Sequence, residues 1–300
     1  MALSRYLDTP QVRFNTPKQR LIASSIVGIP LFIVLMQGDA GSALVFLSFI
    51  MVFNREGLSN WFIYLGIYVV GVSLLALSID KFLLIGAVVV LFSIILTYIY
   101  VVLPRERTVV AIIVGLMLVS IGYIVAIDSA FHSILKPHQQ DRINVILGKL
   151  EDKRGVGYNL EQSKIAIGSG GLFGKGWLQG TQTRYDFVPE MTTDFIFCSI
   201  GEEWGYIGSF VLIALYVLLL QRLISIANRQ RMAYARVYIY SVASIIFMHF
   251  FINIGMTIGL LPVIGIPLPF ISYGGSSLLS FSVMLAIAVK LDSERLVTAL

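Results

Sequence analysis

Eight apolar runs occur in this sequence, and each is long enough, or nearly so, to cross a lipid bilayer as a helix. A helix rises about 1.5 Å per residue, so roughly 20 residues span the hydrocarbon core. Apolar residues make up 57% of the 300 and charged residues only 13%, which excludes a soluble globular domain. We therefore predict an all-α, polytopic membrane helix bundle, with about eight transmembrane helices in a single membrane domain over residues 1–300. The predicted spans are residues 21–37, 42–53, 61–78, 82–101, 109–127, 194–226, 237–261 and 276–289.

The basic residues predict the orientation of these spans. Thirteen lysine and arginine residues fall on one side of the short connections, whereas the other side, apart from the longest loop, carries only Lys81. Because cytoplasmic connections are enriched in basic residues, both termini are predicted to be cytoplasmic and residues 128–193 to form a large extracytoplasmic loop. The net charge of +5 then reflects topology and anionic lipid, and we expect no nucleic-acid partner.

Within this long loop, Ile143, Ile146, Leu147 and Leu150 recur at helical spacing among polar residues. This pattern predicts an amphipathic helix that lies at the outer membrane surface.

Cysteine and histidine usage excludes two kinds of site. Cys198 is the single cysteine, so no intramolecular disulfide can form. His132, His138 and His249 are too scattered to give the ligand spacing of a zinc site.

Residues 162–205 contain the most informative stretch of the chain, a glycine-rich polar loop predicted to run without a break into a membrane helix. Pro189 ends whatever precedes it, and Thr192 or Thr193 is a good cap for the next helix. Asp194 would then lie in the first helical turn. A carboxylate there interacts favourably with the helix dipole, so its position predicts an ionised side chain.

The sequence GSGGLFGKGW within this stretch looks like a phosphate-binding loop but fails in detail. Ser169 replaces the first glycine, and Gly176 replaces the required serine or threonine. What remains is a flexible loop whose amides, with Lys164, Lys175 and Arg184, could hold an anion such as a pyrophosphate. A mobile basic loop at the lipid headgroups is an equally good interpretation of these residues.

Two carboxylates, Glu202 and Glu203, lie deeper in the same predicted span. Such groups are costly in a membrane unless they face a bundle interior or water. They either lock helices together or act on protons or substrate. His249 and Asn253, four residues apart on another span, favour interhelical hydrogen bonding over catalysis.

Two further segments interrupt the apolar runs. Residues 260–277 contain three prolines and three glycines without a charge, so we predict an irregular re-entrant or surface segment near the outer face. It either lines a cavity or forms a packed turn. Asp39 lies at the predicted outer tip between the first two spans. This position is typical of a solvated turn residue.

Four stretches together resemble the SEDS family, the shape, elongation, division and sporulation proteins, and its rod-shape members more than the others. They are GYNLEQSKIAIGSGGLFGKGWLQGTQT from Gly157, FVPEMTTDFIFCSIGEEWG from Phe187, NIGMTIGLLPVIGIPLPFISYGGSS from Asn253 and the weaker QGDAGSALVF from Gln37. The resemblance covers nearly the whole chain.

The resemblance implies a peptidoglycan glycosyltransferase that polymerises lipid II on the outer face of the bacterial cytoplasmic membrane, for cell elongation and shape. It implies a class B penicillin-binding protein transpeptidase and other elongation-complex proteins as partners. It assigns no certain cofactor and leaves open a divalent cation such as Mg²⁺ or Mn²⁺, with unknown ligands. The essential aspartate of the family falls on Asp194.

From this resemblance we expect Asp194 to be the catalytic residue that accepts the proton of the attacking sugar hydroxyl. Cationic side chains would offset the charge of the departing pyrophosphate. The candidate substrate-binding residues are Glu190, Lys164, Lys175, Arg184, Gln179, Asp39, Glu202 and Ser276.

The family usually has ten spans, whereas about eight are predicted in this chain. The chain is expected to begin after the fourth family span, as an N-terminally truncated protein or a late-start gene product. Residues 61–127 are expected to carry an insertion of two spans. Two other functions fit the same features: a flippase for lipid-linked precursors, and a scaffold that recruits a transpeptidase without making bonds.

Overall fold

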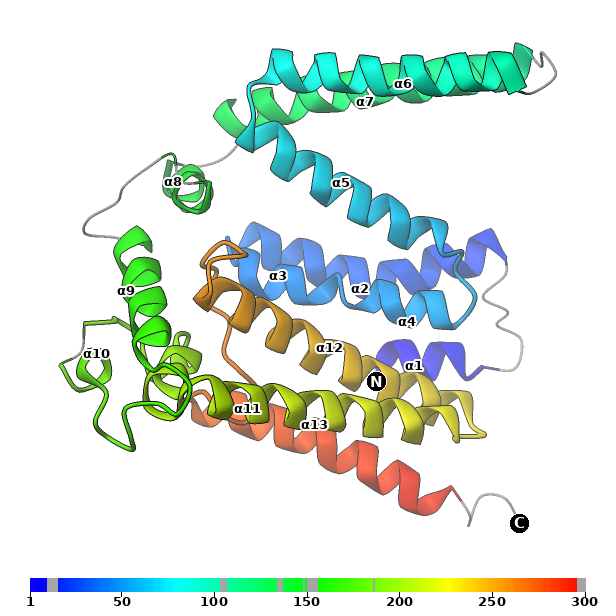
Figure 1. Ribbon diagram of the computed structural model, residues 1–300. Coiled ribbons are helices and arrows are strands. Elements are labelled where there is room, and N and C mark those ends of the chain that lie inside the picture. Colours follow the sequence, from blue (N-terminus) through cyan, green and yellow to red (C-terminus); the bar gives the residue numbers. More distant parts are fainter. Residues whose placement is uncertain are drawn as a thin grey trace. The chain divides into compact units, whose positions relative to one another are not determined.

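The computed structural model describes residues 1–9, 16–102, 107–133, 137–147, 149, 156–185 and 187–295 (Figure 1). Within these residues the regular structure is entirely helical, as predicted. The chain divides into two compact units, Met1–Asn60 with Asp152–Leu300, and Trp61–Glu151.

The larger unit contains nine of the helices and the smaller unit four. Those of the larger unit are α1 (Ala2–Leu7), α2 (Pro17–Met36), α3 (Ala40–Phe46), α4 (Phe49–Arg55), α9 (Val156–Ser169), α10 (Thr181–Arg184), α11 (Ile196–Asn228), α12 (Ala233–Thr257) and α13 (Gly275–Glu294). Those of the smaller unit are α5 (Trp61–Ser78), α6 (Lys81–Val102), α7 (Arg107–Ser133) and α8 (Pro137–Ile146).

Seven helices in the described part of the chain are long and apolar enough to cross a membrane, namely α2, α5, α6, α7, α11, α12 and α13. The chain is therefore a multi-pass membrane protein. The remaining predicted span, residues 42–53, falls in a shorter apolar stretch, Gly41–Arg55. It is divided into α3 and α4 by a break at Leu47 and Ser48. It reaches from Gly41, which lies against Ile264 near the start of α11, to Glu56, which pairs with Arg236 at the opposite end of the bundle.

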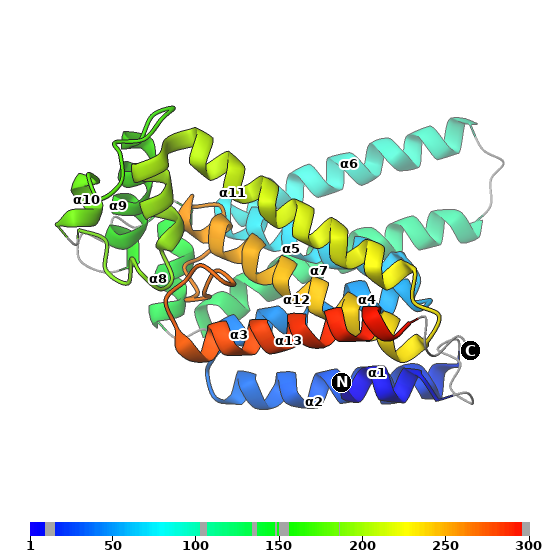
Figure 2. The same ribbon diagram turned by 90° about the horizontal axis from the view of Figure 1, so that it is seen from below.

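Helix α12 forms the centre of the larger unit. In the α12 span 56% of the residues are buried, against 22% in the α11 span. It packs against α11, α13, α1 and α4 (Figure 2). Its small and branched residues, among them Ile239, Ala243 and Ile246, form one apolar cluster with residues of α11 and α13.

Two arginine pairs fix the end of this bundle at which α11 finishes. Arg229 forms a bidentate ion pair with Asp292 of α13. Arg236 of α12 donates two hydrogen bonds to Glu56, both 3.0 Å long. Because guanidinium and carboxylate match in shape, these pairs fix orientation as well as distance. The opposite end, where α11 begins, is held by hydrogen bonds from Asn253 of α12.

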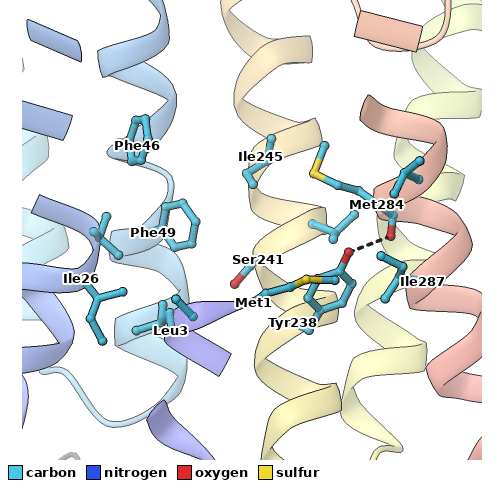
Figure 3. Close-up of a pocket in the computed structure, with 14 residues that line it drawn as sticks. Met1, Leu3, Ile26, Phe46, Phe49, Tyr238, Ser241, Ile245, Met284 and Ile287 are labelled. Carbon is cyan, nitrogen blue, oxygen red and sulfur yellow. Dashed lines mark hydrogen bonds between the residues drawn. The ribbon is translucent and has the colours of Figure 1, made fainter. Parts of the chain in front are cut away.

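An apolar cavity of about 380 Å³ opens between α12 and α13 on one side and α1, α2 and the α3–α4 segment on the other (Figure 3). Its polar side chains are Ser241, which donates to the Val237 carbonyl, and Tyr238, which donates to the Met284 carbonyl at 3.3 Å. No carboxylate lines it. This cavity therefore offers no carboxylate that could act as a general base.

In the smaller unit, α6 and α7 run side by side, and α5 is joined to α7 by hydrogen bonds (Figure 1). Tyr68 donates to Ser120 at 2.7 Å, and the hydroxyls of Ser73 and Tyr123 are 2.8 Å apart. Such polar contacts join helices that have no apolar driving force to associate inside lipid. The predicted amphipathic segment is helical over Pro137–Ile146, whereas Leu150 lies outside the described residues.

Candidate active site

The turn that precedes α11 is organised around the backbone carbonyl of Glu190. That oxygen accepts the amides of Thr193, Asp194 and Phe195 at 3.2, 3.1 and 3.2 Å. Glu190 has a φ of 57°, a left-handed conformation that is uncommon for a residue with a side chain. Three amides on one carbonyl close a tight turn immediately before the helix.

This turn corrects the predicted position of Asp194. Helix α11 begins at Ile196, and its N-cap is Phe195, so Asp194 lies before the helix and outside its first turn. The hydroxyl of Thr193 points back to the Glu190 carbonyl and carboxylate, at 3.1 and 2.9 Å, and does not cap the helix. The prediction failed because the local turn competes for the same threonine.

Asn253 of α12 holds the main chain of Asp194 in place. Its side-chain amide donates to the Asp194 carbonyl at 2.8 Å and to the Ile266 carbonyl at 2.7 Å. Both amide protons of Asn253 are thereby used, and the residue is fully buried. One side chain thus joins α12, the turn before α11 and the irregular segment that follows α12.

The irregular segment supplies the wall beside the Asp194 carboxylate. Gly265 adopts a φ of +76°, and a methyl group placed on it would lie 3.2 Å from Oδ2 of Asp194. The left-handed φ favours glycine, and an added methyl group would crowd the Asp194 carboxylate. Gly265 was not among the predicted site residues. Its only sequence signal was a glycine within a stretch of prolines.

Further hydrogen bonds fasten the segment from Ile258 to Gly274 onto the turn. The Tyr273 amide donates to the Thr192 carbonyl at 2.9 Å, and the Ser272 hydroxyl donates to the Thr193 carbonyl at 2.5 Å. On α12, a ring nitrogen of His249 lies 3.2 Å from the Pro267 carbonyl. The segment is irregular, as predicted. His249 and Asn253 do form hydrogen bonds, but with loop carbonyls and not with a second helix.

The surroundings of Asp194 raise its pKa. Burial of the partly exposed carboxyl is the larger cause, and the nearby negative charge of Glu190 adds to it. The sequence had indicated an ionised carboxylate stabilised by a helix dipole, which is the opposite influence on the pKa. A carboxylate whose main chain is held in place and whose pKa is raised is better suited to accept a proton near neutral pH.

Glu202 is fully buried and receives hydrogen bonds from one continuous loop segment. Lys175 forms an ion pair with it at 2.7 Å, and the amides of Gln182 and Thr183 donate at 3.0 and 2.9 Å. The hydroxyls of Thr181 and Thr183 also donate to its two oxygens. A buried carboxylate with this many donors is well compensated. The prediction was that Glu202 either locks helices together or acts on protons or substrate. These contacts give it a structural role of another kind, because it fastens the segment from Lys175 to Thr183 to α11 and does not join two membrane spans.

The glycine-rich loop also inserts its backbone into a break in α11. At Gly205 the helix is interrupted by a φ of 65° and a ψ of −159°. The amides of Lys175 and Gly176 donate to the carbonyls of Glu202 and Glu203, both at 3.0 Å. On the other side of the break, the amides of Tyr206 and Ile207 donate to loop carbonyls at 2.9 and 3.1 Å. These four bonds replace those that the helix loses at the break.

The loop therefore differs from the predicted flexible anion site. The amides of Lys175 and Gly176 are occupied by α11, and the Lys175 ammonium is occupied by Glu202 and Thr181. The stretch before the loop is also not irregular, because Val156–Ser169 forms α9. We call these contacts of Lys175 and Gly176 with Glu202 and Glu203 the interlock. A substrate-binding role of Lys175 or Glu202 stays a prediction, and it would require the interlock to open.

The other candidate residues surround the site less closely. Lys164 of α9 lies against Gly259, just beyond α12, where a methyl group on the glycine would be 2.5 Å from the lysine nitrogen. Gln179, Arg184 and Ser276 are exposed. Their roles in substrate binding stay predictions.

Asp39 caps α3 by accepting from the Ser42 amide at 2.9 Å and from the Ser42 hydroxyl at 2.6 Å. These hydrogen bonds lower the pKa of Asp39. Its turn packs against the irregular segment, because a methyl group on Gly41 would lie 3.1 Å from the Ile264 carbonyl oxygen. Asp39 and Asp194 thus flank the same short stretch of backbone.

Within the described residues, no group of three or more histidine, cysteine, aspartate or glutamate side chains could hold a metal ion. Mg²⁺ is often held by one or two carboxylates together with substrate phosphates, and Glu190 and Asp194 would be the candidate carboxylates. A divalent cation therefore stays a prediction.

These features define a multi-pass membrane protein with a rigidly held acidic site where a spanning helix begins. Residues 53–296 match the family model of the FtsW, RodA and SpoVE cell cycle proteins, and the chain belongs to this family. It is 44% identical over 180 residues to the peptidoglycan glycosyltransferase MrdB of Escherichia coli (strain K12), covering 58% of this chain and 49% of that protein. It is 39% identical over 163 residues to the peptidoglycan glycosyltransferase RodA of Treponema pallidum (strain Nichols), covering 54% and 38%.

The chain thus spans about half the length, or less, of these curated relatives. A solved structure described as showing the coordination of polymerization and crosslinking by a peptidoglycan synthase complex has the same fold, with a TM-score of 0.62 at 23% identity. That match covers 98% of this chain and 67% of the other.

Proposed function

We propose that this chain is a peptidoglycan glycosyltransferase that polymerises lipid II into glycan strands. The observation that carries the proposal is the Asp194 carboxylate. It is partly buried, its main chain is held by Asn253, and its pKa is raised by burial and by Glu190. The relatives named peptidoglycan glycosyltransferase support this function.

The reaction forms one carbon–oxygen bond and breaks another. The 4-hydroxyl oxygen of one sugar attacks the anomeric carbon of a second, and the bond from that carbon to the lipid pyrophosphate breaks. The pyrophosphate leaves with the bonding electron pair, and Asp194 takes the hydroxyl proton. General-base assistance of this kind typically contributes about 10²–10⁴-fold in rate.

Nearby groups define how Asp194 would act as the base. The turn closed on the Glu190 carbonyl and the Asn253 contact fix the backbone of Asp194, so only its side chain has to be ordered during the reaction. The close approach of Gly265 restricts water on one side. Lys164 and Arg184 are the candidate cations for the leaving pyrophosphate, because Lys175 is paired with Glu202.

We further propose that the chain acts in the bacterial cytoplasmic membrane, with both termini cytoplasmic and Asp194 at the extracytoplasmic end of α11. The partner would be a class B penicillin-binding protein within an elongation complex. Support comes from the basic residues of the connections and from a structural neighbour described as a peptidoglycan synthase complex.

The proposed function predicts glycan synthesis by the purified protein. The full chain, co-purified in detergent with its transpeptidase partner, is expected to convert labelled lipid II into long polymer, detected by gel electrophoresis. Detergent removes sidedness, so a flippase or a scaffold would yield no polymer. Absence of polymer, from a preparation that remains folded and binds its partner, would contradict the proposal.

Glu190→Gln is expected to shift the acid limb of the pH profile to lower pH. Activity requires ionised Asp194, so it falls as pH drops through the pKa of Asp194. The Glu190 charge raises that pKa, and its removal therefore lowers it. The measurement is polymerisation rate against pH, with Glu294→Gln, at the far end of α13, as the control. A limb that stays in place or moves upward would exclude the Glu190 effect.

A further inference from the structure

A second cavity, unlike the apolar one, lies in the smaller unit. It has a volume of about 430 Å³ and is lined by both charged and apolar side chains. This volume is within the range of small-ligand pockets, on the order of 300–1,000 Å³. Its charged residues are Asp80, Lys81, Asp128 and Lys149. We call it the interfacial cavity.

The position of the interfacial cavity follows from the spans that border it. Candidate spans end at Ser78, begin at Lys81 and end at Phe131, and all three ends contribute to the lining or directly adjoin it. Charged side chains at the ends of spanning helices lie at the level of the lipid headgroups. Gln140 and Asn144 of the amphipathic helix α8 line the same cavity.

The charges of the interfacial cavity are balanced. Lys81 and Asp128 form an ion pair at 3.0 Å, in which both side chains remain partly exposed. Asp80 receives the amides of Phe82 and Leu83 at 2.9 and 3.4 Å on a single oxygen, Oδ1. Lys149 adds a second, exposed ammonium. Two carboxylates would oppose a simple anion, and two ammonium groups would oppose a simple cation.

We propose that the interfacial cavity binds the headgroup of a zwitterionic phospholipid that carries a primary ammonium, as in an ethanolamine headgroup. The phosphate would lie at Lys149 and the ammonium at Asp128 and Asp80. Asn144, which also lines the cavity, carries an amide oxygen that is a neutral acceptor for a further N–H group. This site does not depend on the proposed glycosyltransferase activity.

The lining distinguishes ethanolamine from choline. A quaternary ammonium has no N–H to donate and is usually recognised by a cage of aromatic rings. Here Phe131 is the single aromatic residue of the lining, and it is 7% exposed. Carboxylate and amide oxygens therefore match a primary ammonium and leave a quaternary one without its usual partners.

Apolar surface continues from the cavity along the spans. Its apolar lining residues include Ala76, Leu77 and Ile79. Leu75 and Phe82, next to the lining residues, are 48% and 75% exposed on the helices. The acyl chains of a bound lipid would lie along this surface, whereas a free phosphoethanolamine molecule would gain nothing from it.

The test is competition between lipids for the full chain, purified and delipidated in detergent and observed by native mass spectrometry. Phospholipids with the same acyl chains and an ethanolamine, choline or glycerol headgroup are added in equal amounts. The ethanolamine lipid is expected to be retained at least about fivefold over the choline lipid, as one or two charge-assisted hydrogen bonds allow. Equal retention, or preference for the anionic glycerol lipid, would overturn the proposal.

Two variants locate the site. Asp128→Asn is expected to bring the ethanolamine to choline ratio close to one. Lys149→Gln is expected to lower the retention of both lipids, because both carry the phosphate. Lys290→Gln, which changes an exposed lysine of α13, leaves retention and ratio unchanged. Melting temperatures establish that the variants are folded, since Asp128→Asn also breaks the pair with Lys81. Undiminished preference in the folded Asp128→Asn protein, or undiminished retention of both lipids by the folded Lys149→Gln protein, would exclude this cavity.

Discussion

Replacing Asp194 by asparagine is expected to lower the rate of glycan polymerisation by about 10²–10⁴-fold, the usual contribution of a general base. Asparagine has nearly the same size, and the contact with Asn253 uses the main-chain carbonyl of residue 194, which the substitution keeps. The loss should therefore be one of chemistry and not of folding. The measurement is the single-turnover rate with labelled lipid II, together with the melting temperature.

The control for Asp194→Asn is Asp141→Asn, which removes an exposed carboxylate from α8. It is expected to polymerise at the normal rate. The acid limb of the pH profile should also disappear in Asp194→Asn, because the group that titrates is gone. Normal polymerisation by a folded Asp194→Asn protein would refute the assignment of the base, although the chain could still be a glycosyltransferase.

The spans were predictable because one physical requirement, a run of apolar residues about 20 long, sets them. The exception was residues 42–53, where the run was short and the structure divides it at Leu47 and Ser48. The helix Val156–Ser169 was missed because its polar residues and the neighbouring glycines indicated a loop. Gly168 lies inside that helix, in open space, where glycine weakens a helix without breaking it.

For Asp194, the sequence indicated a candidate residue but not its surroundings. The choice of residue followed from the family resemblance and from its place at the start of a span. Its raised pKa depends on burial beneath groups distant in sequence, which include Gly265 and Asn253. Contacts across about 60 to 70 residues leave no local pattern. The prediction from local helix electrostatics therefore gave the wrong influence on the pKa.

The interlock between the glycine-rich loop and α11 was invisible for a related reason. Its bonds join backbone to backbone, so no side-chain pattern marks the partners. The available signals were the glycines themselves. Gly174 has a φ of +78°, and Gly205 interrupts a span that is otherwise helical. The resemblance to a phosphate loop arose from the same glycines, which here allow two backbones to approach closely.

This interpretation predicts that Gly174→Ala will destabilise the protein strongly. A methyl group at residue 174 would lie 2.1 Å from the Glu203 carbonyl oxygen and 2.6 Å from the Trp204 nitrogen. Both are backbone atoms and cannot rotate away, so the loop must withdraw and lose its bonds to Glu202 and Glu203. With about 1 kcal/mol for each hydrogen bond and 1–3 kcal/mol for the strained backbone, the loss is expected to be about 3 kcal/mol or more.

Gly168→Ala is the matched control, because it makes the same chemical change six residues earlier, where a methyl group meets nothing within 4 Å. It should stabilise α9 by about 0.5–1 kcal/mol. Thermal unfolding in detergent can be followed by the fluorescence of Trp177 and Trp204, whose rings lie 6.1 Å apart at the interlock. Equal melting temperatures for the two alanine variants would mean that the loop does not occupy the break in α11.

The polymerisation rate of Gly174→Ala shows whether the loop only supports α11 or also takes part in the reaction. If the loop only supports α11, Gly174→Ala should lose polymerisation in proportion to the fraction unfolded and regain it at low temperature, unlike Asp194→Asn. If the loop must leave α11 for Lys175 to reach substrate, Gly174→Ala should polymerise faster than the normal protein at temperatures where both are folded. The partly buried Lys175–Glu202 pair is 2.7 Å long, and Glu202 accepts four further hydrogen bonds from Thr181, Gln182 and Thr183. These contacts make the first result the expected one.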